Sequence, residues 1–146
     1  MNDKTKELSA SVKLINNKLN FSGITEGNTP VSIDYTPPLG DNLGYTSLEL
    51  FLLSLNSCIG SSVLTFLRRM NKNIAGCEIH SRGIRKQEHP TGFNTIYLDI
   101  RIQSPDVSED DMRKVIKLSE DTYCPVWSMI KGNVAVEVSF RIEAVS

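Results

Sequence analysis

Cys58 and Cys124 are the residues of this chain whose type and surroundings best suit covalent chemistry. Cys124 precedes Pro125, and because proline favours the first position of a helix, we expect Cys124 to be the N-cap of a short helix. Free backbone N–H groups and the positive end of the helix dipole favour the thiolate there, which is the nucleophilic form of cysteine. The alternative is that Cys124 is a small apolar residue that fills a corner of the core.

Cys58 lies in an apolar run that predicts a helix. Burial alone would raise its pKa and make it inert, so reactivity requires a nearby polar group and access to solvent. The nearest acidic residue on the helix is Glu49, nine positions earlier. Nine residues turn a helix by about 900°, which places the two side chains on opposite sides. A shared site therefore requires a bent helix or the Glu49 of a second subunit. Alternatively, Glu49 forms a capping box with Thr46.

The remaining residues that could bind metals or cofactors form no convincing site. Cys77 and His80 have the spacing of half a metal site, but three positions along a strand put them on opposite faces. We expect Cys77 to be structural and His89 to be a solvated turn residue. The sequence contains no phosphate-binding glycine loop or nucleotide fingerprint. It therefore predicts no metal and no cofactor.

The elements that position these cysteines follow from the spacing of apolar residues. Alternation of apolar and polar residues predicts strands, and a period near 3.6 predicts helices. The predicted order is strands near 8–14, 18–22 and 31–35, a long helix over 46–72, strands near 75–79 and 95–102, helices over 108–121 and 125–131, and a strand near 134–142. Strands and helices are segregated rather than alternating, which indicates a single α+β domain over residues 1–146 with a largely antiparallel sheet.

Composition narrows the class of protein. The formal net charge of the 146 residues is −1, whereas broad nucleic-acid binding needs a basic surface. Three cysteines are too few for a secreted disulfide scaffold, and an odd number cannot all pair with one another. The polar N-terminus does not resemble a signal peptide. We therefore expect a cytoplasmic protein. The apolar run 48–67 contains Glu49 and Asn56, so we interpret it as a buried central helix and expect no membrane span.

The chain resembles the OsmC/Ohr family in two motifs. The run Ser-Leu-Glu-Leu-Phe-Leu-Leu-Ser-Leu-Asn-Ser-Cys at 47–58 is similar to the first, and Cys124-Pro125-Val126 is similar to the second. The resemblance implies an intertwined α+β homodimer with largely antiparallel sheets around a long central helix and two sites at the subunit interface. It also implies thiol-dependent reduction of organic hydroperoxides. Cys58 would be the peroxidatic thiolate and Cys124 the resolving thiol, with an external dithiol as reductant.

Two positions differ from the well-characterised hydroperoxidases of this family, which pair an early arginine with a glutamate ten residues before the reactive cysteine. Here the first arginine is Arg68, and Leu48 occupies the glutamate position with Glu49 beside it. Glu49 is thus the candidate carboxylate of the site. These differences leave two alternatives to the enzyme. One is a non-catalytic protein that binds an apolar ligand or a partner in the interface pocket. The other is a redox-responsive thiol protein without turnover.

Overall fold

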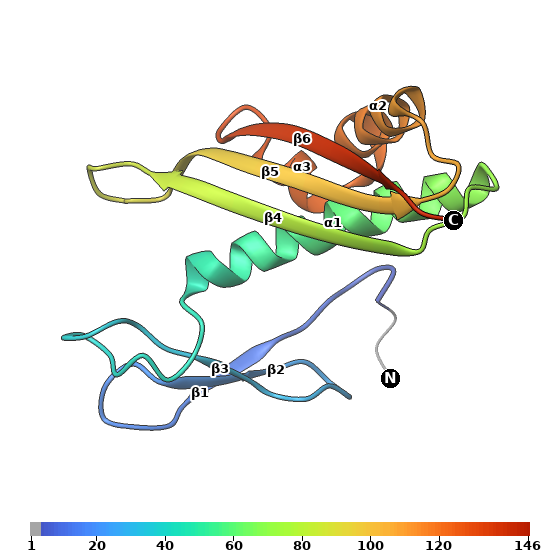
Figure 1. The fold of residues 1–146 in the computed structure, drawn as a ribbon. Coiled ribbons are helices and arrows are strands. Elements are labelled where there is room, and N and C mark those ends of the chain that lie inside the picture. The colour runs from blue at the N-terminus through green and yellow to red at the C-terminus, as the bar shows by residue number, and fades with distance from the viewer. Residues whose placement is uncertain (1–3) are drawn as a thin grey trace. The chain divides into compact units, whose positions relative to one another are not determined.

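The computed structural model describes residues 4–146, and its elements follow the predicted order of strands and helices (Figure 1). They are β1 (Ser11–Leu14), β2 (Phe21–Ile24), β3 (Val31–Ile33), α1 (Ser47–Arg69), β4 (Gly76–Arg85), β5 (Phe93–Ser104), α2 (Glu109–Leu118), the π-helical turn η1 (Ser119–Tyr123), α3 (Pro125–Ile130) and β6 (Ala135–Ala144). The chain divides into two compact units, the first ending at Phe51 and the second spanning Leu52–Ser146. The α+β class is confirmed. That the whole chain forms one domain stays a prediction.

The first unit contains an antiparallel sheet in the order β1-β2-β3. β2 begins three residues later than the sequence pattern predicts, and the side chain of Asn16 explains the shift. Its Oδ1 accepts hydrogen bonds from the backbone N–H groups of Lys18 and Asn20, at 3.0 and 3.1 Å. These bonds hold residues 16–20 in a wide turn, because an asparagine side chain that binds nearby backbone groups competes with strand pairing.

A buried carboxylate organises the loop that follows β3. Asp34 is only 2% exposed, and it accepts hydrogen bonds from the backbone N–H groups of Tyr35, Asp41 and Leu43 at 2.7, 3.3 and 3.0 Å. Burial by itself raises the pKa of Asp34. The three backbone hydrogen bonds and the nearby charge of Lys18 outweigh it, so the pKa lies below the usual range. Asp34 is therefore ionised in the folded protein and closes the loop.

We predict that Asp34→Asn lowers the melting temperature at pH 7 by several degrees, because the asparagine amide group would meet N–H donors. The folded-state pKa is depressed, so the charged carboxylate contributes stability above the unfolded-state pKa of about 4. This contribution is lost as the pH falls through the folded-state pKa. Thermal unfolding from pH 7 to pH 2 should therefore show that the difference between the two proteins shrinks with acid. The control is Asp110→Asn, because the side chain of Asp110 is 95% exposed. This variant should change neither the melting temperature at pH 7 nor its dependence on pH.

The second unit is built on a sheet in the order β4-β5-β6. β4 pairs with β5 antiparallel, and β5 pairs with β6 parallel, because the chain crosses over through α2, η1 and α3 between them. Alternate residues of β5 form the centre of the core. Ile96, Leu98, Ile100 and Ile102 are at most 1% exposed. Their neighbours in sequence point to the opposite face, so β5 separates the core from solvent.

Helix α1 packs its buried stripe in this core. Leu55, Ile59, Val63 and Leu67 follow one another at intervals of four residues, and each is 0% exposed. The helix comes close to β4 at Gly60, where an added Cβ would lie 2.7 Å from Ile79 Cδ1. Within residues 4–146, α1 is the one helix long and apolar enough to cross a membrane, a test of length and composition that core helices also pass. That the protein has no membrane span stays a prediction.

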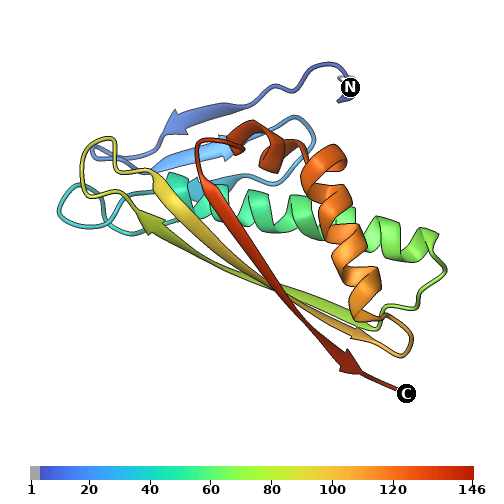
Figure 2. The same cartoon turned by 90° about the horizontal axis from the view of Figure 1, so that it is seen from above.

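The sequence pattern extended the next helix too far. It predicted one helix over 108–121, whereas α2 ends at Leu118 and η1 follows. In η1 the backbone N–H of Cys124 donates to Ser119 O at 2.9 Å, a bond that spans five residues instead of four. The extra residue per turn reorients the chain before α3, which Figure 2 shows lying between the end of α2 and the start of β6. Periodicity cannot reveal a turn of this kind, because it changes the backbone and not the apolar pattern.

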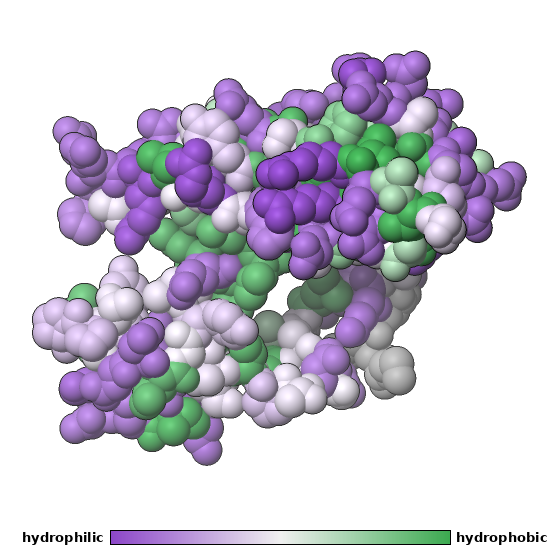
Figure 3. Space-filling model, viewed as in Figure 1, coloured by the Kyte–Doolittle hydropathy of each residue, from purple (hydrophilic) through white to green (hydrophobic). Residues whose placement is uncertain are grey.

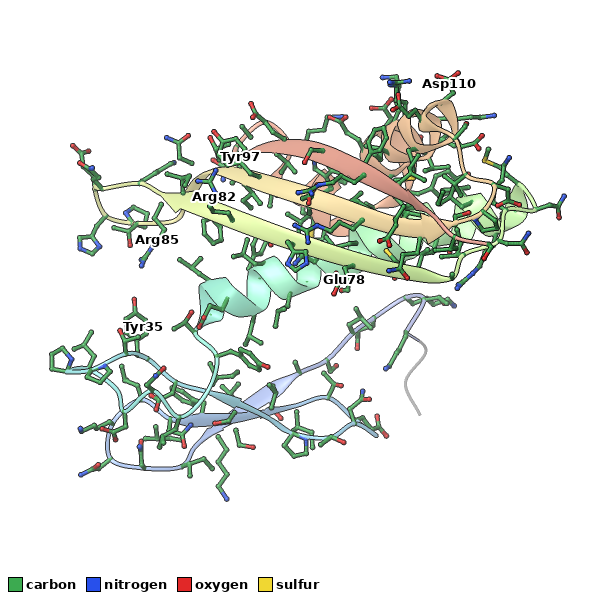
Figure 4. The ribbon with its side chains drawn as sticks, in the orientation of Figure 1. Tyr35, Glu78, Arg82, Arg85, Tyr97 and Asp110 are labelled. Atoms are coloured by element: carbon green, nitrogen blue, oxygen red, sulfur yellow. The ribbon has the colours of Figure 1, made fainter. Side chains whose placement is uncertain are left out.

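The outward face of the second unit's sheet is polar. Arg82 lies over the ring of Tyr97, with 4.6 Å from its guanidinium carbon to the ring centroid (Figure 4). Asp99 pairs with Arg101 at 3.0 Å and with Arg141 at 3.8 Å. Hydrophilic side chains accordingly gather over β4 and β5 in Figure 3. Two arginines of this face are thus paired with Asp99.

Candidate thiol site

The tertiary structure brings Cys58 and Cys124 together. Cys58 lies in α1, Cys124 is the N-cap of α3, and 66 positions separate them in sequence. Their sulfur atoms are 2.7 Å apart, with Cys124 Sγ donating its hydrogen to Cys58 Sγ, and both thiols are free. A disulfide needs about 2.05 Å between the sulfurs, so a small movement would allow the bond to form. The two cysteines singled out from the sequence therefore form one pair within one chain.

The predicted N-cap position of Cys124 is confirmed, but the predicted thiolate is wrong. Its Sγ accepts a hydrogen bond from the backbone N–H of Trp127 at 3.5 Å, which favours the charged form. Cys124 is, however, only 2% exposed. Burial, followed by the hydrogen bond and the charge of Cys58, raises the pKa of Cys124 to about 12. Because burial outweighs the helix end, Cys124 stays a protonated thiol at neutral pH and acts as a hydrogen-bond donor.

We predict that alkylation distinguishes the two thiols. Iodoacetamide at pH 8 should modify Cys58 at least tenfold faster than Cys124, because the reagent needs a thiolate and an open path. Cys58 is half-buried and lines a cavity, whereas Cys124 is buried and has a pKa of about 12. Peptide mass mapping over a time course measures both rates. The unfolded protein in urea is the control and should lose the difference. If Cys124 were labelled faster than Cys58 in the folded protein, the assignment of Cys124 as the buried, protonated thiol would be wrong.

Cys58 opens into a cavity of about 400 Å³ that lies wholly within the second unit. The cavity is bounded by polar residues of α1, by aromatic rings and by the chain around Cys124. Its lining consists of Cys58, Ser61, Ser62, Thr65, Phe66, Arg69, Tyr123 and Pro125. It therefore gives a small molecule access to the sulfur of Cys58 while Cys124 lies behind it.

The aromatic wall of this cavity is a cluster of three side chains. The rings of Phe66 and Tyr123 meet edge to face, with centroids 4.6 Å apart. The guanidinium carbon of Arg69 lies 5.6 Å from the centroid of Phe66. Sequence reasoning missed these three residues. Helical spacing was an available signal for Arg69 alone, because it follows Cys58 at eleven positions and thus shares its side of α1.

Glu49, the third residue of the predicted site, forms the capping box of α1. Its carboxylate accepts a hydrogen bond from the backbone N–H of Thr46 at 2.8 Å, and its own N–H donates to Thr46 Oγ1 at 3.3 Å. The hydrogen bonds with Thr46 lower the pKa of Glu49, and burial opposes them only weakly. The alternative interpretation of Glu49 is thus confirmed as a structural role. A catalytic role for Glu49 stays a prediction.

The third cysteine and the histidines form no second site. Cys77 is half-buried in β4, and burial raises the pKa of its thiol. His80 points to the exposed side of the same strand, where its Nε2 is 3.7 Å from a carboxylate oxygen of Glu78. Among the residues that the structure describes, no group of three His, Cys, Asp or Glu side chains is placed to hold a metal ion. The chemistry of the described region thus centres on Cys58 and Cys124.

Known proteins share this fold. The family described as "OsmC-like protein" matches residues 40–139. The protein YhfA of Escherichia coli is 24% identical over 97 residues, which cover 66% of this chain and 72% of YhfA. A hypothetical protein from Aquifex aeolicus has a TM-score of 0.85 at 22% identity, covering 97% of this chain and 99% of that one. The organic hydroperoxide resistance protein OhrB of Bacillus subtilis has a TM-score of 0.66 at 15% identity, covering 94% and 99%.

Proposed function

The chain belongs to the family of OsmC-like proteins, and from this premise we propose that it reduces organic hydroperoxides with Cys58 as the peroxidatic thiol and Cys124 as the resolving thiol. The observation that carries the proposal is the 2.7 Å separation of the two sulfurs, one of which borders a cavity. The fold shared with a protein named for organic hydroperoxide resistance supports the choice of substrate. Family membership alone does not identify the reacting residues of this chain, whereas the short distance between the sulfurs of Cys58 and Cys124 is a feature of its own structure.

The two thiols have the properties that their proposed roles need. Cys58 reaches the cavity, and its sulfur accepts the hydrogen of Cys124. Cys124, with its pKa raised to about 12, retains its proton and does not compete for peroxide. The pair thus has one accessible nucleophile and one protected partner.

The proposed reaction has three steps that balance. The thiolate of Cys58 attacks the outer oxygen of ROOH, the O–O bond breaks, and ROH leaves after taking up a proton, with a sulfenic acid on Cys58. The thiol of Cys124 then attacks that sulfur and releases water, which forms the Cys58–Cys124 disulfide. An external dithiol finally reduces the disulfide by thiol–disulfide exchange. Each turnover thus consumes one peroxide and oxidises one dithiol.

We propose that the working form is a homodimer in the cytoplasm. Leu8, Val12 and Leu39 in the first unit are apolar side chains that are 74%, 59% and 61% exposed. On α1, Leu53 is 49% exposed, and the buried Oδ1 of Asn56 has no hydrogen-bond partner within residues 4–146. A second chain would cover these groups. Light scattering coupled to gel filtration should give twice the mass of the chain, and a monomer would contradict the proposal.

The direct test is peroxide consumption by purified protein with a dithiol reductant. We expect cumene hydroperoxide to be consumed over many turnovers and one equivalent, without reductant, to convert both thiols to a Cys58–Cys124 disulfide. Mass mapping of non-reduced peptides identifies the bond. If both thiols remain free while peroxide persists, the protein is not a hydroperoxide reductase. A disulfide that forms once without turnover would instead indicate a redox-responsive thiol protein.

A non-catalytic binding function is the second candidate, and the cavity beside Cys58 is the observation that favours it. A space of about 400 Å³ beside the ring of Phe66 suits an apolar ligand. Thermal shifts with a neutral aromatic alcohol such as cumyl alcohol test it. Shifts that persist in the Cys58→Ser/Cys124→Ser variant, together with absent peroxide turnover, would support binding alone.

A further inference from the structure

The wall of the thiol cavity formed by α1 has a polar stripe that ends in a cation. Cys58, Ser62, Thr65 and Arg69 follow one another at intervals of four, three and four residues, and all four line the cavity. These intervals keep side chains on one side of a helix. Eleven residues advance a helix by about 16 Å, so the stripe runs from the reactive sulfur to a guanidinium group about three turns away.

Arg69 leans back along this stripe. Helical side chains tilt towards the N-terminus of their helix, and Arg69 places its guanidinium carbon 5.6 Å from the ring centroid of Phe66, one turn earlier. This position brings the cation closer to Cys58 than the rise of about 16 Å between their backbone positions. The aromatic ring also restricts the guanidinium group, which lowers the entropy lost when it binds an anion.

The charge of Arg69 is available. Among the described residues, Arg69 has no ion pair, and it is the single charged residue in the cavity lining. The acidic residues of the neighbouring η1 are already paired, Asp121 with Lys117 at 3.2 Å and Glu120 with Lys131 at 3.7 Å. A substrate anion that enters this cavity therefore meets a free cation rather than a carboxylate.

We propose that Arg69 is a specificity-determining residue that selects hydroperoxides carrying an anionic group at the end of the molecule far from the peroxide. This inference rests on the proposed function. The anion binds the guanidinium fork of Arg69, the chain of the substrate lies along Phe66, and the peroxide reaches Cys58. Binding through the remote anion lowers KM and leaves the chemical step on sulfur unchanged, so neutral hydroperoxides remain substrates with lower efficiency.

The test compares 9-hydroperoxynonanoic acid with its methyl ester, which has the same chain without the charge. We expect kcat/KM of the wild-type protein to favour the acid by about tenfold, as one charge-assisted contact allows. Arg69→Gln should reduce the ratio to near one through the KM of the acid, and Arg69→Lys should retain part of it. Raising the salt concentration should lower the wild-type preference, because salt screens exposed charges.

Arg68→Gln is the matched control. Arg68 adjoins Arg69 at the same end of α1 but does not line the cavity, and its charge acts on Cys77 instead. This variant should keep the preference for the acid. Equal efficiency of acid and ester in the wild-type protein would overturn the inference, as would an Arg69→Gln variant that retains the preference.

A binding measurement separates this inference from the proposed function. The product acid, 9-hydroxynonanoate, should slow alkylation of Cys58 in the wild-type protein and not in Arg69→Gln, whether or not peroxide is turned over. If no hydroperoxide is consumed but this protection depends on Arg69, the proposed function fails and the anion site stands. If hydroperoxides are consumed but protection is absent or independent of Arg69, the anion site fails and the proposed function stands.

Discussion

Replacing Cys58 with serine is expected to reduce peroxide consumption by on the order of a thousandfold or more, because a serine hydroxyl cannot supply the nucleophile that a thiolate supplies. Cys124→Ser should have a different effect. The first equivalent of peroxide should still be reduced, because Cys58 keeps its cavity, but the oxidised protein should hold a sulfenic acid on Cys58 instead of a disulfide. Dimedone trapping and mass spectrometry detect this species.

The third cysteine is the control for both variants. Cys77 lies in β4, outside the thiol cavity, and burial raises its pKa. Cys77→Ser should keep the turnover rate and the disulfide of the parent protein. Wild-type turnover in Cys58→Ser would disprove the assignment of the nucleophile. A disulfide between Cys58 and Cys77 in Cys124→Ser would disprove the assignment of the resolving thiol.

Replacing Trp127 with alanine is expected to have the largest effect on stability near the site. The side chain of Trp127 is 3% exposed, and its backbone N–H donates to Cys124 Sγ. Removal of a buried tryptophan costs about 3–5 kcal/mol, because it leaves a cavity as well as losing apolar burial. Urea unfolding should show this loss. α3 has only six residues and depends on packing for its position, so disulfide formation after one equivalent of peroxide should also slow.

Met129 provides the comparison on the same helix. It is 77% exposed, so Met129→Ala should change the free energy of unfolding by about 0.5 kcal/mol or less and leave disulfide formation unchanged. Trp127→Phe should recover part of both losses, because it refills much of the space. If Trp127→Ala is destabilised but forms the disulfide at the wild-type rate, α3 is not what positions Cys124.

The element order could be predicted from sequence because it depends on local patterns. Two such patterns are the alternation of apolar residues in β5 and the capping box of Thr46 and Glu49. Each depends only on residues close in sequence, and both are present in the structure. Boundaries were less accurate where a side chain or a single hydrogen bond intervened. The hydrogen bonds of the Asn16 side chain make β2 begin later in the sequence. The hydrogen bond from Cys124 N–H to Ser119 O spans five residues, so the end of the predicted helix is η1 instead. Neither contact changes the apolar pattern.

The sequence alone determined that Cys58 lies within a long helix and that Cys124 caps a short one, because helix length and a following proline are local properties. Only the tertiary structure decided that the two sulfurs meet within one chain, since 66 residues separate them. It also decided the protonation of Cys124. The helix end that favours a thiolate is visible in sequence, but burial depends on the whole fold, and burial raises the pKa to about 12. The same folding placed Arg69, which no motif indicated, on the cavity of Cys58.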